Sequence, residues 1–151
     1  MGNSCVEISV YGEKNYRLFL DIIKQELDII GVGDINPIQA FILMNINENV
    51  VTIGEVISRG YYIGSNASYN IKKMISNGYV QQTPSDFDKR AAYLKLTDKG
   101  LSLYEKLDAD IKKLLDSFTP QIKGKFDLEQ CVAFLKKVEY FWKDVLSRRV
   151  R

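Results

Sequence analysis

The distribution of apolar residues predicts a long amphipathic helix over residues 13–30. Its main stripe repeats at spacings of four, three, four and three residues and consists of Tyr16, Leu20, Ile23, Leu27 and Ile30. A second apolar stripe beside it consists of Phe19, Ile22 and Ile29. A helix that is apolar on two sides must be covered on two sides, either by its own domain or by a partner chain. Residues 1–10 have little pattern, and we expect them to form a loose arm.

Capping signals predict where the next two helices begin. Two glycines interrupt the first helix, and Asn36 followed by Pro37 predicts a helix that starts there and ends near residue 45. Thr52 and Glu55 have the spacing of a capping box, in which each side chain accepts a hydrogen bond from the other residue's backbone N–H. They are expected to open a short helix over residues 53–58.

A further helix over residues 65–77 completes a helix-turn-helix pattern. Glycines before it permit a turn, and Asn77 followed by Gly78 is a good C-terminal cap. Two short helices separated by a glycine-containing turn are typical of a helix-turn-helix.

A β-hairpin is predicted directly after this pattern. The segments Tyr79–Thr83 and Ala91–Leu96 are expected to form its strands, around a long polar tip over residues 84–89. Val50 and Val51 are expected to form a very short additional strand.

Two helices are predicted in the last third of the chain. Thr97 caps the first, which should run to about Phe118, before a break at Pro120 and Gly124. The second should span residues 127–148. The predicted fold is therefore mainly α with a small β-hairpin wing. It consists of an N-terminal arm and dimerisation helix (1–35), a winged helix-turn-helix lobe (36–100) and C-terminal dimerisation helices (101–151).

The composition argues against most enzymes. The 151 residues include no histidine, which removes the commonest general base and zinc ligand, and no glycine-rich phosphate loop is present. We therefore expect no catalytic residues, no metal and no cofactor. The two cysteines, Cys5 and Cys131, lie far apart, and no segment resembles a signal peptide or membrane span. These features favour a soluble, cytoplasmic protein that does not contact the membrane.

The positive charge is concentrated in the predicted lobe. The net charge of the chain is only +2, but residues 56–97 hold six basic and two acidic residues, a net charge of +4. The remainder holds 15 basic and 17 acidic residues, a net charge of −2. A positive module within a slightly acidic frame is typical of a protein that binds nucleic acid.

The helix over residues 65–77 separates into two faces. Ala67, Ile71, Met74 and Ile75 fall within about 100° of arc, which is the width of a buried face. Polar side chains that are able to contact bases or phosphates occupy the opposite face and its flanks: Ser65, Asn66, Ser68, Tyr69, Asn70, Lys72 and Lys73. Taken alone, this face has a second interpretation as an ordinary solvated helix surface.

The hairpin tip supplies a second candidate contact. Lys89 and Arg90 are placed where they would reach an adjacent minor groove or its phosphates. Asp88 is expected to orient these basic side chains, because a carboxylate there would repel phosphate. The alternative is a solvated turn without function.

These motifs resemble the MarR family of winged helix regulators. The wing segment Asp88-Lys89-Arg90 and the later Leu96-Thr-Asp-Lys-Gly100 match the family's wing pattern. Met74-Ile-Ser-Asn-Gly78-Tyr-Val80 matches the end of its recognition helix, and the flanking helices also fit. The segment 61–70 departs from the family because it is unusually aromatic and because Asn70 stands where an aliphatic residue is common. The same stretch faintly resembles the branch that contains LdtR.

The resemblance implies a homodimer whose first and last helices interlock, with two wings astride a palindromic site in double-stranded DNA. It also implies a small phenolic or lipophilic effector, bound between the dimer helices and the DNA-binding lobe. Phe19, Phe41 and Met44 are candidates for lining that pocket, and the alternative for each is a plain core position. Some relatives sense oxidants, so Cys5 pairing with Cys131 of the partner subunit is a further hypothesis. Cys131 has an alternative role as a small core residue.

We therefore predict a sequence-specific, homodimeric DNA-binding regulator of the MarR type, acting as a repressor or an activator. The alternative is a winged-helix module that binds another protein and has no DNA target of its own.

Overall fold

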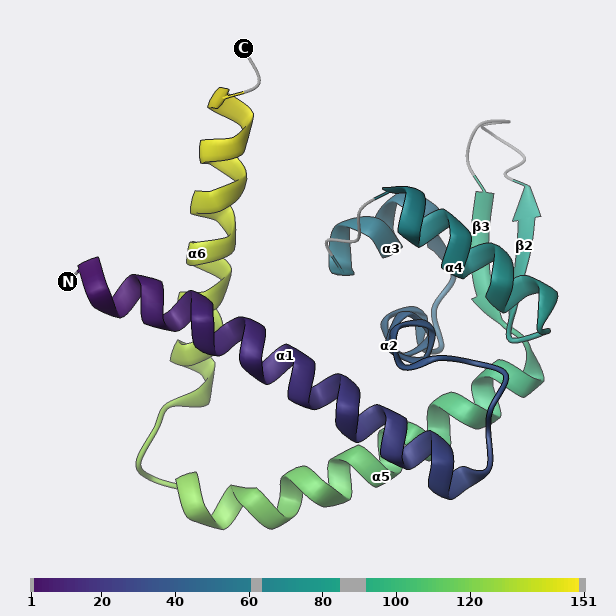
Figure 1. The fold of residues 1–151 in the computed structure, drawn as a ribbon, viewed down its shortest axis with the longest axis horizontal. Helices are drawn as coiled ribbons and strands as arrows, with labels where there is room; N and C mark the ends of the chain where they lie inside the picture. The colour runs from purple at the N-terminus through teal and green to yellow at the C-terminus, as the bar shows by residue number, and fades with distance from the viewer. Residues whose placement is uncertain (1, 61–63, 85–91, 150–151) are drawn as a thin grey trace. The chain divides into compact units, whose positions relative to one another are not determined.

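The computed structural model describes residues 2–60, 64–84 and 92–149. The described helices are α1 (Gly2–Ile30), α2 (Pro37–Ile46), α3 (Ile53–Gly60), α4 (Gly64–Ser76), α5 (Asp98–Ile122) and α6 (Leu128–Arg149) (Figure 1). The described strands are β1 (Val51–Thr52), β2 (Val80–Pro84) and β3 (Ala92–Leu96). The chain is thus mainly helical with a small sheet, which confirms the predicted fold class.

The chain forms two compact units, residues 1–111 and 112–151. The first unit contains α1 to α4, the sheet and the first half of α5. The second unit contains the remainder of α5 and all of α6.

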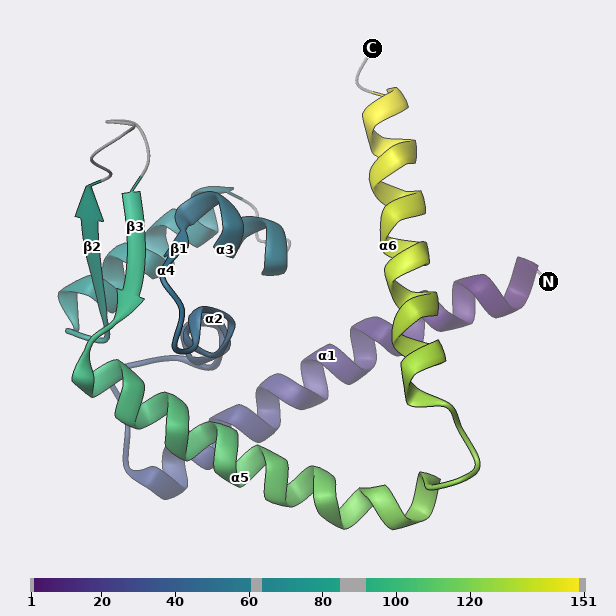
Figure 2. The same cartoon turned by 180° about the vertical axis from the view of Figure 1, so that it is seen from behind.

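The sheet is antiparallel, with the strand order β1-β3-β2 (Figure 2). The hairpin register pairs Val80 with Leu96 and Pro84 with Ala92, while β1 adds Val51 opposite Leu94. Val51, Val80 and Leu94 are buried, so one face of each strand points into the first unit. The sheet therefore serves as a wall against which the helices of this unit pack.

One hydrophobic core holds the first unit together. Its buried members come from α1 to α5 and from the sheet, and include Ile23, Leu43, Val56, Met74 and Leu107. Burial of an aliphatic side chain of this size contributes about 1.5–3 kcal/mol. The main apolar stripe of α1 supplies Ile23 and Leu27 to this core, as its periodicity predicts.

Local capping signals set the starts of α2 and α3. The Asn36 side chain accepts a hydrogen bond from the Gln39 N–H, and the Gln39 side chain accepts one from the Asn36 N–H. The Glu55 N–H donates to Thr52 Oγ1 at 3.1 Å, and the Thr52 N–H donates to Glu55 Oε2 at 2.6 Å. Both predicted caps are confirmed.

Two predictions about helix ends are wrong. Residues 2–10 are helical and continue α1 rather than forming a loose arm. Pro120 does not end α5, which continues to Ile122. Proline removes one N–H donor from the last turn, and the exposed position leaves the unpaired carbonyl of Asp116 to water. The break falls at Gly124, the second of the two predicted positions, whose φ is 75°.

Gly100 allows α5 to begin in contact with the hairpin. A Cβ atom at this position would overlap the carbonyl oxygen of Tyr79 and would lie 3.3 Å from Cβ of Leu96. The Thr97 N–H donates to the same Tyr79 carbonyl at 3.0 Å, so the two backbones are held together where they approach most closely.

Substitution of Gly100 by alanine should therefore destabilise the first unit. Because the added methyl group would overlap the Tyr79 backbone and crowd the Leu96 side chain, we expect a loss of about 1–3 kcal/mol in the free energy of unfolding, measured by urea denaturation. The control is Gly12→Ala, which lies in α1 with no atom within 4 Å of an added Cβ. It should raise stability by up to about 1 kcal/mol. Equal stability of the two variants would contradict the role of Gly100.

Candidate nucleic-acid interface

α4 presents one buried face and one exposed face, as the sequence predicts. Ala67, Ile71 and Met74 are buried against α2 and β2. The helix ends at Ser76, and the φ of 77° at Gly78 allows the Tyr79 N–H to donate to the Met74 carbonyl at 2.9 Å. This ending fixes the length of α4 and turns the chain directly into β2.

The candidate DNA-contacting side chains of α4 are largely exposed. This group consists of Asn66, Ser68, Tyr69, Lys72 and Lys73. The Tyr69 side chain is 66% exposed, an unusual amount for an aromatic residue in the middle of a helix. Ser65 lies in the first turn of α4, and its side chain is outside the described part of the structure. A row of amide, phenol and ammonium groups along one open helix face is suited to contact a polar, anionic partner.

An open cleft of about 410 Å³ borders this exposed face. Its walls come from the connection between α1 and α2 and from α4, and its lining residues are Gly33, Asp34, Ile35, Asn36, Gln39, Tyr69, Lys73 and Asn77. Solvent therefore reaches Tyr69 and Lys73 both through this cleft and across the exposed face of α4.

The prediction for Asn70 is wrong in its placement. Asn70 is only 9% exposed, and its Oδ1 accepts a hydrogen bond from Nε2 of the equally buried Gln39 at 3.1 Å. Its Nδ2 donates to the carbonyl of Asn66 at 2.9 Å. The side chain therefore points into the protein, and it belongs to the support of α4 rather than to its outer face.

The second candidate contact lies in the sequence between β2 and β3. Asp88, Lys89 and Arg90 lie outside the described residues, so their predicted contacts remain predictions. Gln82, Thr83 and Lys95 are exposed on the described strands. The described part of the hairpin thus exposes polar side chains on both of its strands.

A polar junction at the C-terminal end of α4 was not predicted from the sequence. Asp34 Oδ1 accepts a hydrogen bond from the Tyr79 hydroxyl at 2.5 Å, and its Oδ2 lies 2.9 Å from Lys99 Nζ. Asn77 Nδ2 donates to the Asp34 carbonyl, while Lys99 Nζ donates to the Asn77 carbonyl at 2.9 Å. Lys99 Nζ also lies 4.0 Å from the centre of the Tyr79 ring. Four elements meet here, namely the α1–α2 connection, the end of α4, the start of β2 and the start of α5.

The junction shifts the titration of two of its members. The hydrogen bond from the Tyr79 hydroxyl and the hydrogen bond from Lys99 hold the pKa of Asp34 below its ordinary value. Burial of the phenol and its bond to Asp34 raise the pKa of Tyr79 well above its usual range. Asp34 is therefore charged and Tyr79 neutral near neutral pH, the two forms that the hydrogen bond requires.

The proposed effector residues surround an aromatic contact in the core. The Phe19 and Phe41 rings pack edge to face with 5.7 Å between their centroids, and Tyr16 lies 5.9 Å from Phe41. Phe19, Phe41 and Met44 are half-buried and pack against the core cluster. Their alternative role as core residues is visible in these contacts, whereas effector binding remains a prediction.

The two cysteines lie on different helices, α6 and α1. Cys131 is an exposed free thiol on α6, so its alternative role as a core residue is wrong for the described chain. Cys5 is part of α1, and its side chain lies outside the described residues.

Within the described ranges, no group of three or more Cys, Asp or Glu side chains is arranged to hold a metal ion. No described helix is long and apolar enough to cross a bilayer.

Known proteins share this architecture. The winged helix DNA-binding domain family matches residues 35–100. The exopolysaccharide II synthesis transcriptional activator ExpG of Rhizobium meliloti (strain 1021) is 32% identical over 136 residues, which cover 90% of this chain and 70% of ExpG. AbsC, a MarR family transcriptional regulator from Streptomyces coelicolor, superposes with a TM-score of 0.72 at 18% identity and covers 95% of this chain and 97% of its own. A mutant MarR from E. coli, complexed with operator DNA, gives a TM-score of 0.69 at 20% identity and covers 90% and 96%.

The Asp34 carboxylate should make the stability of the junction depend on pH. Because the folded-state pKa is lowered, its contribution is present above the ordinary carboxyl pKa of 3.8 and is lost as the pH falls through the lowered value. Asp34→Asn keeps a hydrogen-bond acceptor for Tyr79 but removes the ion pair with Lys99. Because both side chains are half exposed, we expect a loss of only about 0.5–1 kcal/mol in the free energy of unfolding at pH 6. The difference from the unmodified protein should vanish in strong acid.

Urea denaturation at a series of pH values measures this difference. The control is Glu13→Gln, which breaks an exposed ion pair with Arg17 inside α1 and should cost less than about 0.5 kcal/mol. A difference between Asp34→Asn and the unmodified protein that stayed constant down to pH 2 would show that the ion pair is not its source.

Proposed function

The chain belongs with the winged helix DNA-binding transcriptional regulators, and we propose that it is of the MarR type and binds a pseudo-palindromic operator in duplex DNA as a homodimer. The observation that carries the proposal is the exposed polar face of α4, where Asn66, Tyr69 and Lys73 lie on a helix that is buried on its other side. The protein would act by binding alone, without a catalytic step.

The dimensions and chemistry of α4 suit the major groove of DNA. An α-helix with its side chains is about 10–12 Å across, close to the groove's width of about 12 Å. An asparagine amide is able to pair with both hydrogen-bonding groups of an adenine edge, so Asn66 is the candidate base reader. Lys72 and Lys73 would neutralise phosphates, and Tyr69 would contact the backbone or a thymine methyl group.

The wing would supply a contact outside the major groove. Lys89 and Arg90 are proposed to reach the minor groove beside the site read by α4, with Asp88 orienting them. The support for this step is the sequence of the wing and the antiparallel pairing of β2 and β3 on either side of it.

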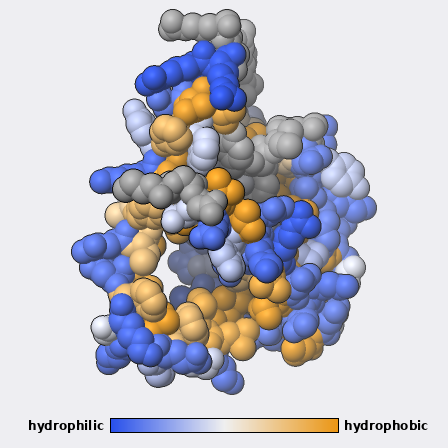
Figure 3. Space-filling model, turned by 60° about the vertical axis from the view of Figure 1, so that its left-hand side comes forward, coloured by the Kyte–Doolittle hydropathy of each residue, from blue (hydrophilic) through white to orange (hydrophobic). Residues whose placement is uncertain are grey.

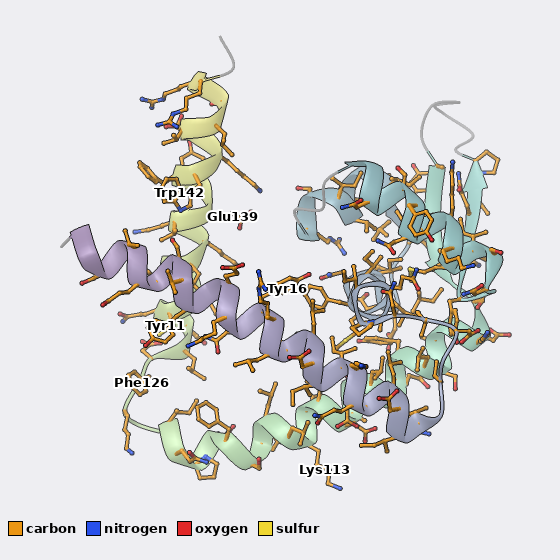
Figure 4. The ribbon with its side chains drawn as sticks, in the orientation of Figure 1. Tyr11, Tyr16, Lys113, Phe126, Glu139 and Trp142 are labelled. Atoms are coloured by element: carbon orange, nitrogen blue, oxygen red, sulfur yellow. The ribbon has the colours of Figure 1, made fainter. Side chains whose placement is uncertain are left out.

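The apolar surfaces of the terminal helices support the homodimer. None of the described residues of α6 is buried. Its exposed apolar side chains include Leu128, Leu135, Phe141, Trp142 and Leu146, each about half accessible to solvent. Figure 3 shows apolar side chains open at the surface, and Figure 4 shows Trp142 projecting from α6. Soluble proteins rarely leave so much apolar surface uncovered, so a second copy of the chain is the proposed cover.

Regulation by a small phenolic or lipophilic molecule completes the proposal. The half-buried rings of Phe19 and Phe41 are the candidate site, because they lie between α1, which the dimer would use, and α2, which supports α4. A ligand that separated these rings would change how α2 and α4 rest on α1.

DNA binding is tested by substitutions with two different expected signatures. Arg90→Ala and Lys73→Ala should each weaken binding to all duplexes alike and should lower the slope of log affinity against log salt by about one. Asn66→Ala should instead change the preference among sequences, with little effect on that slope. Gel shifts at several salt concentrations, on duplexes selected from a random pool, give both quantities.

Absence of salt-dependent duplex binding by the unmodified protein would overturn the proposal. It would favour the second candidate, a winged-helix module that binds another protein. Unchanged affinity in both Arg90→Ala and Lys73→Ala would reject the assigned phosphate contacts.

The homodimer is tested by placing a charge on each face of α6. Trp142→Asp should yield a monomer in sedimentation velocity, because the carboxylate would have to be buried in the subunit interface. The matched control is Tyr140→Asp, on the same helix but about 160° away around its axis, where the side chain is 76% exposed. This variant should remain dimeric. A dimer that tolerates Trp142→Asp as well as Tyr140→Asp would contradict the assigned interface.

A further inference from the structure

A buried pair of amide side chains joins α4 to α2. Gln39 is 4% exposed and Asn70 is 9% exposed, and the Gln39 Nε2 donates to Asn70 Oδ1 at 3.1 Å. They are the buried polar residues of a core that is otherwise apolar over the described residues. Burial of an amide costs free energy that only its hydrogen bonds offset. The bonds of this pair therefore indicate what the pair does in the fold.

Every hydrogen bond of this pair leads to a helix end or a helix turn. The Gln39 Oε1 accepts from the Asn36 N–H at 3.1 Å, which completes the cap of α2. The Asn70 Nδ2 donates to the Asn66 carbonyl at 2.9 Å, one turn earlier in α4. No buried side-chain nitrogen or oxygen among the described residues is left without a partner. The result is a continuous chain of bonds from the N-cap residue of α2 to the turn of α4 that carries Asn66.

Asn70 lies at the boundary between the two faces of α4. At 100° per residue, it is about 40° from buried Met74 on one side and about 40° from exposed Asn66 on the other. Lys73 lies on the same side as Asn66, about 60° from Asn70 around the helix axis. Apolar contacts by Ala67, Ile71 and Met74 are non-directional and tolerate a small rotation of the helix, whereas a hydrogen bond restricts both distance and angle.

We propose that the Gln39–Asn70 hydrogen bond fixes the rotation of α4 about its own axis and makes Asn70 a positioning residue for sequence recognition. This inference rests on the proposed DNA-binding function. A side-chain tip about 5 Å from the helix axis moves by nearly 2 Å when the helix rotates by roughly 20°. That displacement exceeds the tolerance of a hydrogen bond to a base edge, which holds between about 2.7 and 3.2 Å. Asn70 thus acts on the bases through Asn66 and its neighbours, without touching DNA.

Two substitutions break the bond from opposite sides. Asn70→Leu supplies an aliphatic side chain of similar size and leaves the Gln39 donor without a partner. Gln39→Glu keeps an oxygen acceptor for the Asn36 N–H but removes the donor to Asn70. We expect each variant to lower the preference for a selected duplex over point-substituted duplexes by roughly tenfold. The salt dependence should stay unchanged, because the phosphate contacts persist. The double variant should lose no more than the single variants, since all three lack the same bond.

The experiment starts from the best duplexes that the unmodified protein selects from a random pool. Affinities are measured by fluorescence anisotropy at a temperature where circular dichroism shows each variant to be folded. Ile111→Val is the control, because it removes a buried methyl group from α5 and lowers the unfolding midpoint without touching the amide pair. It should leave sequence preference intact.

Unchanged preference in folded Asn70→Leu and Gln39→Glu would overturn the inference, as would an equal loss in Ile111→Val. If Asn70→Leu does not fold, Gln39→Glu decides the outcome alone. Absence of any sequence preference in the unmodified protein would overturn the proposed function, and this inference with it. The two failures are therefore distinguishable.

Discussion

The burial of one face of α4 against α2 and β2 is the interaction on which the rest of the structure depends. An isolated helix of 13 residues with three serines and two asparagines would be marginal in water. Ile71 and Met74 are essentially removed from solvent, and each contributes about 1.5–3 kcal/mol by its burial. The helix therefore exists because it is docked, and its opposite face is free to carry residues chosen for chemistry rather than for helix stability.

This constraint explains why the helix-turn-helix was readable from the sequence. The buried face of α4 appears in the sequence as apolar residues repeated at helical spacing. The caps at Thr52 and Asn36 are each formed by two residues only three positions apart. Such signals are local, so no contact from elsewhere in the fold is needed to recognise them. The end of α4 is also a local feature, because the positive φ of Gly78 and the residues beside it stop the helix just before this glycine.

The features that were missed depend on contacts between distant positions or on the surroundings of a helix end. Asn70 was assigned to the outer face because its residue type is polar, but its partner Gln39 lies 31 positions away. The Asp34–Tyr79–Lys99 junction joins residues up to 65 positions apart. The first turns of α1 contain no proline, and the glycine inside the helix at position 12 costs only about 1 kcal/mol, so the helix extends through an apparently patternless segment.

The two unpredicted networks converge on the same short segment. Asp34 binds the C-terminal end of α4 through the Asn77 side chain, and Asn36 reaches the middle of α4 through Gln39. Segment 34–39 is also the direct continuation of α1, since Val32 closes that helix by donating to the Leu27 carbonyl at 2.9 Å. α4 is thus attached at two points, by directional bonds, to the residues that follow the proposed dimerisation helix. A displacement of α1 would move α4 as well, because these bonds fix the distance between segment 34–39 and α4. Apolar packing alone would allow the two to slide against each other. In the proposed dimer, the separation and rotation of the two α4 helices would then be set by the same few residues in each subunit.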